Sequence, residues 1–229
     1  MITSNNSVEP MAKNSEIKKV RIDIISDVMC PWCVIGYRGL AEALEQLEGE
    51  LEAVIHWQPF ELNPNMPEEG QDLGEHITQK YGSTPEQSQQ NRDHITQLGA
   101  KLGFEFNFTV GQRILNTFNA HQLLHWAGES SDLQTKLKTA LLDAYFTQGR
   151  DVSDNDVLVT IADDVGLDAE FARNLLNNQV YAGDVRALQE QWRQLGVTAV
   201  PSFIVDDKYI ISGGQPPEAF LQNLRQMIE

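Results

Sequence analysis

The alternation of apolar and polar positions divides the chain into two β-rich ends and a long helical middle. Lys19–Ser26 (KVRIDIIS) alternates β-branched and polar residues, which is typical of a strand, and Leu51–Pro59 (LEAVIHWQP) fits a second strand. Between them, Val34–Leu47 carries apolar residues at roughly helical spacing. The order strand, helix, strand favours a parallel pair of strands with a right-handed crossover.

The middle of the chain has helical periodicity in almost every segment from Gln71 to about Leu195. The predicted helices are Glu75–Tyr81, Pro85–Leu102, Thr117–Ala127, Leu133–Gln148, Asp154–Val165, Asp168–Asn177 and Asp184–Leu195. Gly103–Phe108 (GFEFNF) is an aromatic, irregular spacer between two of them. This stretch predicts a helical insertion between the two β-rich ends.

The β pattern returns after Gly196. Ser202–Val205 and Lys208–Ser212 are predicted strands, and the two aspartates between them favour a tight hairpin turn. Pro217–Ile228 then reads as an amphipathic helix. The whole pattern therefore predicts an α/β protein in which βαβ and ββα segments flank the helical middle.

Both cysteines of the 229-residue chain fall in one motif, Cys30-Pro31-Trp32-Cys33, directly after the first strand. A CxxC pair beside a βαβ pattern indicates a thiol redox site. The N-terminus of a helix favours the thiolate of Cys30, which is the nucleophilic form, and Cys33 follows one turn later. Pro31 suits an early helical position, and Trp32 offers flat apolar area beside the sulfur for a substrate.

Zinc binding is the competing interpretation of the two cysteines. A structural zinc site needs about four ligands. The chain has no further cysteine, and although His121 and His125 could complete a set, nothing in the sequence places them near Cys30. We therefore predict no metal site, and we expect His76 and His94 to be surface residues.

A second motif, Gly196–Phe203 (GVTAVPSF), contains a proline that opens a predicted strand. Few X–Pro bonds are cis. With the CPWC motif at this topological distance, however, the layout is thioredoxin-like, and we predict a cis Pro201 packed against the two sulfurs. The backbone at Val200 would then be free to pair with an extended substrate.

Four segments resemble the DsbA-like branch of the thioredoxin superfamily, and more narrowly its FrnE-like members. They are SDVMCPWCVIG (Ser26–Gly36), WQPFELNP (Trp57–Pro64), NTFNAHQLLHWA (Asn116–Ala127) and GVTAVPSFIVDDKYIISGGQ (Gly196–Gln215). The likeness runs from about Val20 to the C-terminus. It implies a thioredoxin fold with a large, all-helical inserted domain, and a thiol–disulfide oxidoreductase acting on a disulfide- or thiol-containing protein or small molecule.

The resemblance also assigns roles to individual residues. It implies that Cys30 is the nucleophile, Cys33 the resolving thiol and Pro201 the cis-proline. Val200 corresponds to a position that tunes redox behaviour in the superfamily. Three further residues lie on a helix that the likeness directs toward the active site, and they are candidates for substrate binding: Asn116, Thr117 and His121.

The sequence departs from periplasmic DsbA in three respects. Trp32 stands where DsbA has a histidine that stabilises the thiolate, and Ile24 replaces a buried glutamate that accepts a proton from the resolving thiol. Asp27 is the nearest replacement for that glutamate and Asp23 the second, although a strand-end or helix-cap carboxylate explains either equally well. The additional cysteine pair linked with isomerase behaviour in some relatives is absent.

We expect residues 19–64 and 196–229 to form the thioredoxin-like domain, 65–195 the inserted helical domain, and 1–18 a disordered tail.

The N-terminal residues show no apolar core of a signal peptide, which predicts a cytoplasmic protein, and Met11 competes with Met1 as the natural start. The net charge of −16 argues against nucleic acid or an anionic membrane surface as a partner. We predict no bound cofactor, with glutathione retained as a reductant or substrate.

Two other function classes compete with the oxidoreductase. Kappa-type glutathione transferases and hydroxychromene-carboxylate isomerases resemble the same fold, but their catalytic position is typically a serine, and here both cysteines are present. A non-catalytic binding module would not need two adjacent reactive thiols. In a reducing cytoplasm we expect the reductase or isomerase direction. The sequence favours neither a monomer nor an oligomer.

Overall fold

The structure is a computed structural model that describes residues 17–130 and 132–228. The expected N-terminal tail, except Ile17 and Lys18, and the choice between Met1 and Met11 lie outside the described residues. In chain order the elements are β1 (Lys18–Ser26), α1 (Pro31–Glu45), β2 (Leu51–Pro59), β3 (Gln71–Asp72), α2 (Leu73–Tyr81), α3 (Pro85–Lys101), β4 (Arg113–Ile114), α4 (Phe118–Ser130), α5 (Gln134–Phe146), α6 (Asn155–Val165), α7 (Ala169–Asn178), α8 (Ala182–Gln194), β5 (Ser202–Val205), β6 (Tyr209–Ser212) and α9 (Pro217–Ile228). Within these ranges, no helix is both long and apolar enough to cross a lipid bilayer.

Strands from the two ends of the chain form one mixed sheet in the order β2-β1-β5-β6. β1 pairs with β2 in parallel and with β5 antiparallel, so that Ile24 stands between Trp57 and Phe203. β1 is central and is buried from Ile22 to Ser26 because the sheet is covered on both faces. The predicted parallel pair and the predicted hairpin of β5 and β6 are both confirmed.

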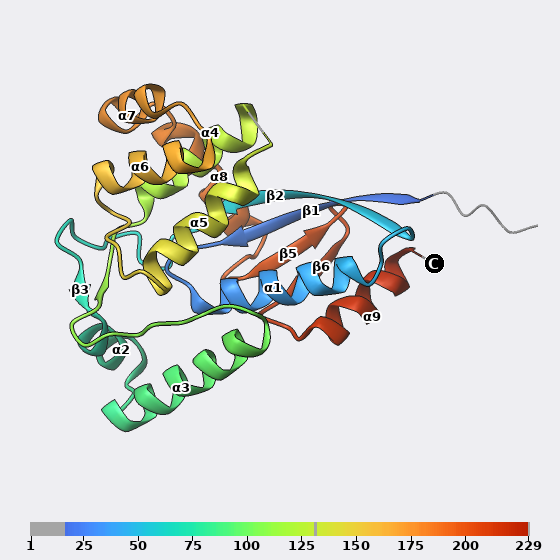
Figure 1. Ribbon diagram of the computed structural model, residues 1–229, viewed down its shortest axis with the longest axis horizontal. Coiled ribbons are helices and arrows are strands. Elements are labelled where there is room, and N and C mark those ends of the chain that lie inside the picture. Colours follow the sequence, from blue (N-terminus) through green and yellow to red (C-terminus); the bar gives the residue numbers. More distant parts are fainter. Residues whose placement is uncertain (1–16, 131, 229) are drawn as a thin grey trace, which may run out of the picture.

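The two faces of the sheet carry different cores. Ile22 and Ile24 pack with side chains of α1 and α9 on one face, whereas Ile25 packs with Trp192 of α8 on the other. The alternation follows from the two-residue period of a strand. Figure 1 shows α1 and α9 in front of the sheet and α4–α8 gathered at one end of it.

The helical middle of the chain packs around a second core. It shares this core with residues at the start of α1 and just before it, which are Val28, Met29, Val34 and Ile35. Buried residues of α4–α7 form one apolar cluster with aromatic residues of the spacer that follows α3, among them Phe104 and Phe106. α4, α5 and α8 all contact β2, so this layer is joined to the edge of the sheet. Helices and sheet edge thus meet near the carboxyl end of β1.

The short ladder of β3 and β4 was not predicted. Gln71 pairs with Ile114 and Asp72 with Arg113. Two-residue strands show no measurable alternation, so the pattern of apolar residues could not reveal them. The apolar run alone would begin α1 at Val34, whereas the helix begins at Pro31 with Cys30 as its N-cap, as the CPWC motif predicts.

Candidate active site

The CPWC motif joins the end of β1 to the first turn of α1. Cys30 is the N-cap with extended backbone angles (φ −96°, ψ 111°), and Pro31 follows in the first turn, where a proline loses no helical hydrogen bond. The Cys33 amide donates to the Cys30 carbonyl at 3.0 Å, and the Cys30 amide to the Asp27 carbonyl at 3.3 Å. Cys30 therefore lies at the N-terminus of α1, as the sequence predicts.

The two cysteines are free thiols in unequal surroundings. Cys30 keeps 4% of its surface exposed and Cys33 none. Burial, followed by the contact with the Cys30 sulfur, raises the pKa of Cys33 well above the ordinary value of a thiol. Cys33 therefore keeps its proton at neutral pH and needs a base before it can attack.

The loop before β5 closes over Cys30. The Val200–Pro201 peptide bond is cis, which confirms the prediction from the sequence. The Cys30 Sγ lies 3.7 Å from the Val200 carbonyl oxygen. A Cβ on Gly36 would lie 3.0 Å from the Pro201 ring and 2.9 Å from the Phe203 ring, so only glycine lets α1 approach this loop so closely.

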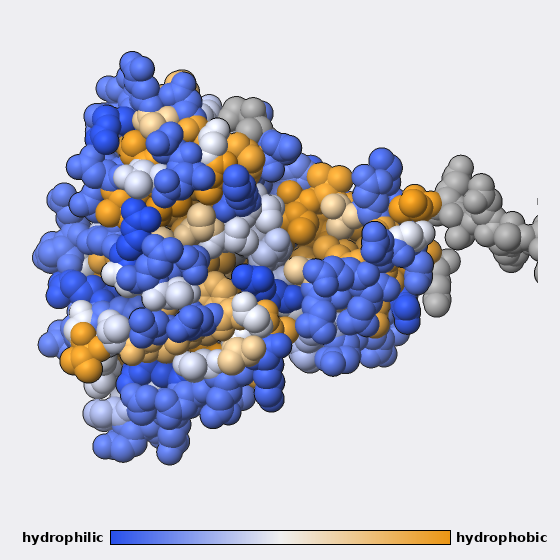
Figure 2. All heavy atoms as spheres, in the orientation of Figure 1, coloured by the Kyte–Doolittle hydropathy of each residue, from blue (hydrophilic) through white to orange (hydrophobic). Residues whose placement is uncertain are grey.

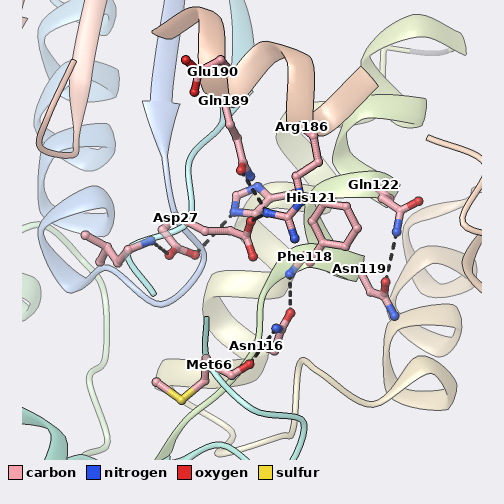
Figure 3. A network of polar contacts seen from close by, with 12 residues as sticks. Asp27, Met66, Asn116, Phe118, Asn119, His121, Gln122, Arg186, Gln189 and Glu190 are labelled. Carbon is pink, nitrogen blue, oxygen red and sulfur yellow. Dashed lines mark hydrogen bonds and ion pairs between the residues drawn. The ribbon is translucent and has the colours of Figure 1, made fainter. Parts of the chain in front are cut away.

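A buried polar cluster lies near the thiols, and Asp27 belongs to it. Figure 3 shows Asp27 at one end of this network, next to His121. Its Oδ2 accepts from the Leu62 amide at 2.7 Å, and its Oδ1 lies 3.5 Å from Nε2 of His121. Burial alone would raise the pKa of Asp27, but the contact with His121, the Leu62 amide and the charge of Lys138 together lower it. Asp27 is therefore ionised at neutral pH although it is fully buried.

Lys138 on α5 is the group in this cluster that the sequence analysis missed. Its side chain is fully buried, and among the described residues its Nζ has no hydrogen-bond partner. The amino group lies 5.3 Å from the centroid of the Trp57 ring. Burial lowers its pKa to about 8, and the charges of Cys33, Asp27 and Cys30 oppose that shift. One signal was available: Lys138 falls between Gln134 and Leu141 on the apolar face of its helix, where a lysine is unusual.

Asp27 rather than Asp23 lies beside the thiols. The Asp23 carboxylate accepts from Arg21 at 2.7 and 2.8 Å and from Gln58 at 2.6 Å, which ties it to the sheet. The Asp27 backbone contacts the Cys33 thiol, and its side chain is one of the charges that act on Lys138. Of the two carboxylates considered from the sequence, Asp27 is the one whose residue contacts the Cys33 thiol.

The three candidate substrate-binding residues lie at the start of α4 (Figure 3). Asn116 donates to the Met66 carbonyl at 3.0 Å and accepts from the Phe118 amide at 2.9 Å. Thr117 is buried, and its carbonyl accepts from the His121 amide at 3.1 Å. His121 points inward to Asp27. Substrate binding by these residues stays a prediction.

Of the other histidines, His94 is exposed, as predicted, and its ring centroid lies 6.3 Å from that of Trp32 in the CPWC motif. His125 lies 3.3 Å from Glu129 and against the ring of Tyr181. No group of three or more potential metal ligands occurs in the part of the chain that the structure describes. The expectation that His76 is a surface residue is wrong: it is 9% exposed, and its Nδ1 lies 2.8 Å from Oε1 of Gln71. It is buried because it faces inward from α2.

Comparisons with known proteins find a matching family model, a similar curated protein and several solved structures of similar fold. The sequence model of the family described as DSBA-like thioredoxin domain matches residues 21–225. The probable DsbA oxidoreductase SCO1869 from Streptomyces coelicolor is 36% identical, with a TM-score of 0.83 over 90% of this chain and 89% of that one. The uncharacterized protein YwbO of Bacillus subtilis (strain 168) is 29% identical over 202 residues, which are 88% of this chain and 94% of YwbO. The cytosolic disulfide reductase DsbM from Pseudomonas aeruginosa, in its structure with GSH, is 17% identical and has a TM-score of 0.61 over 91% of this chain and 98% of its own.

Proposed function

The chain belongs to the DSBA-like thioredoxin domain family and is an oxidoreductase, and we propose that it exchanges disulfides through Cys30 and Cys33. One observation carries this proposal. The two thiols are free and three positions apart at the N-terminus of a helix, with the inner thiol fully buried beneath the outer one. This arrangement suits a nucleophile and a resolving thiol.

The reaction begins when the Cys30 thiolate attacks one sulfur of a substrate disulfide. A bond forms between the Cys30 sulfur and that sulfur, and the other half of the substrate leaves as a thiolate. Cys33 then loses its proton and attacks the Cys30 sulfur, which releases the second half of the substrate. The substrate gains two electrons and the dithiol loses two, and glutathione as the external thiol returns the pair to its reduced form.

Asp27 is the group we assign to the proton of Cys33. Its carboxylate is ionised, fully buried and held by the Leu62 amide and His121, while its backbone contacts the Cys33 thiol. It therefore takes over the role of the buried glutamate of DsbA, whose position in the sequence is occupied here by Ile24. Lys138 supplies a positive charge to the same cluster, which acts to lower the pKa of Cys33 against the effect of burial.

Pro31, Trp32 and Val200 border Cys30 and remain partly exposed, so we assign them to substrate contact. The Val200 carbonyl beside the Cys30 sulfur would accept a hydrogen bond from an extended substrate backbone. We place the protein in the FrnE-like branch on the four sequence segments quoted above. We also propose a cytoplasmic location and the reductase or isomerase direction, because both cysteines serve the redox motif and none forms a structural disulfide.

The proposal is tested with Cys33→Ser and Cys30→Ser, each mixed with oxidised glutathione and followed by intact mass. Cys33→Ser should accumulate one glutathione on Cys30, because no second thiol resolves the adduct. The wild-type chain should instead lose both thiols without a lasting adduct, and Cys30→Ser should react slowly because Cys33 is buried. If Cys33→Ser gains no glutathione and retains a glutathione-dependent isomerase activity, the isomerase alternative replaces the oxidoreductase.

A further inference from the structure

A pocket opens beside the CPWC motif, on the side of α2 and α3. Met29 and Pro31, the two neighbours of Cys30, form one wall of it. The opposite walls come from α2 and α3 through Ile77 and Ile95, and from the end of α5 through Phe146. Segments that are far apart in the sequence therefore enclose a space next to the nucleophile that we have proposed.

The lining is mainly apolar, and among the described residues Arg92 is its one charged side chain at pH 7. Arg92 donates to the Ser88 hydroxyl at 2.7 Å and to Gln89 at 2.7 Å. Burial, with the charge of Lys80, lowers the pKa of His76, so its ring is neutral at pH 7. A cation would lose water here beside the Arg92 guanidinium and with no carboxylate among the described residues of the lining, which disfavours it.

The size of the pocket limits what it can hold. Its internal space is about 110 Å³. That is about three quarters of the ~150 Å³ that hold one benzene molecule, so the pocket, which opens at the surface, can take most of a single large side chain but not a whole peptide or glutathione. Tyr81 also lines the pocket. Burial is the main cause that raises the pKa of Tyr81, and the charge of Cys30 is the second, so the phenol lies close enough to that sulfur to interact with it.

We propose that this pocket binds one large apolar side chain, aromatic or branched aliphatic, next to the cysteine of the disulfide substrate. A residue adds about 3.3 Å to an extended chain, so a side chain adjacent to the attacked cysteine can reach a pocket whose wall is formed by the neighbours of Cys30. The proposal rests on the proposed function, because it needs Cys30 to be the atom that attacks. It makes the enzyme selective for disulfides in apolar sequence surroundings.

The test uses two symmetric peptide disulfides as oxidants of the reduced full chain. One is made from N-acetyl-Phe-Cys-Phe-amide and the other from N-acetyl-Ser-Cys-Ser-amide, and thiol loss is followed by acid quench. Ile77→Trp fills the pocket from α2, and Leu221→Trp makes the same change at a half-buried aliphatic residue of α9 that does not line the pocket. Phenylalanine on both sides of cysteine makes the result independent of which neighbour enters.

We expect the wild-type chain and Leu221→Trp to react about tenfold faster with the phenylalanine disulfide, the gain that burial of one such side chain gives. Ile77→Trp should react with the two disulfides at nearly equal rates, while its rate with the serine disulfide stays within about twofold of wild type. That unchanged rate shows that the variant is folded. If the wild type reacted equally fast with both disulfides, or if Ile77→Trp kept the full preference for the phenylalanine disulfide, the proposed role of the pocket would be overturned. Failure of every variant to be oxidised would instead overturn the proposed function.

Discussion

At the scale of single residues, the site depends on unequal burial of groups that look alike in the sequence. Cys30 and Cys33 are three positions apart, yet one is at the surface of the site and the other is enclosed. Lys138 and Lys136 lie on the same helix, and only Lys138 is buried. The CPWC motif predicts the positions of the two thiols. No motif identifies Lys138, because its buried environment is created by contacts with segments that are distant in the sequence.

Lys138→Met tests the buried charge. The folded-state pKa of about 8 lies below the ordinary 10.5, so the fold disfavours the charged form. That penalty is complete below about pH 8 and disappears as the pH rises to about 10.5. We expect the substitution to raise the free energy of unfolding by roughly 3 kcal/mol at pH 7, with the gain reduced to roughly 1 kcal/mol at pH 10.

Urea unfolding of the reduced protein at both pH values measures this effect. Lys136→Met is the control on the exposed side of the same helix. It removes one hydrogen bond to the Val165 carbonyl (2.9 Å), so it should lower the free energy of unfolding by no more than about 1 kcal/mol, in contrast to the gain expected for Lys138→Met. If Lys138→Met raised the free energy of unfolding equally at pH 7 and pH 10, burial would not lower the pKa of the Lys138 amino group, and this prediction would be contradicted.

At the scale of secondary structure elements, the sequence predicts most of the architecture but not how its layers are joined. Strands and helices in which apolar residues recur at a regular spacing lie within a few residues of their predicted bounds. The connection between the sheet and the helices depends on Gln134, the first residue of α5. Its side chain accepts from the Trp57 amide at 2.9 Å and donates to the carbonyls of Trp57 and Leu124 at 3.0 Å each. The sequence cannot predict this role for a glutamine in the first turn of a helix, because its hydrogen-bond partners are backbone groups of other elements.

Gln134→Glu should weaken this connection while it keeps the size of the side chain. A carboxylate cannot donate, so the carbonyls of Trp57 and Leu124 would lose a donor and face a buried negative charge. We expect the free energy of unfolding to fall by roughly 2–4 kcal/mol in urea at pH 7. Gln97→Glu on the exposed side of α3 is the control and should change it by less than about 0.5 kcal/mol. A loss for Gln134→Glu no greater than that of the control would contradict this role.

At the scale of the whole molecule, the site exists only because three parts of the chain meet. The segment between β1 and α1 provides Asp27, the segment before β5 provides Pro201, and the helical middle provides His121 and Lys138. The order of elements and the CPWC motif predict the first two, whereas the contribution of the helices needs the packing of α4 and α5 on the sheet. The surface seen in Figure 2 is largely hydrophilic with separate apolar patches, as expected for a chain with a net charge of −16.

The central claim is that the whole chain is a dithiol–disulfide exchanger, and its most direct test is the redox equilibrium of Cys30 and Cys33 against glutathione. Thiols are trapped and counted at each ratio of reduced to oxidised glutathione. We expect both to disappear together in one two-electron transition, at a potential nearer about −270 mV than about −120 mV. Two thiols counted at every ratio, with no intramolecular disulfide, would contradict the claim.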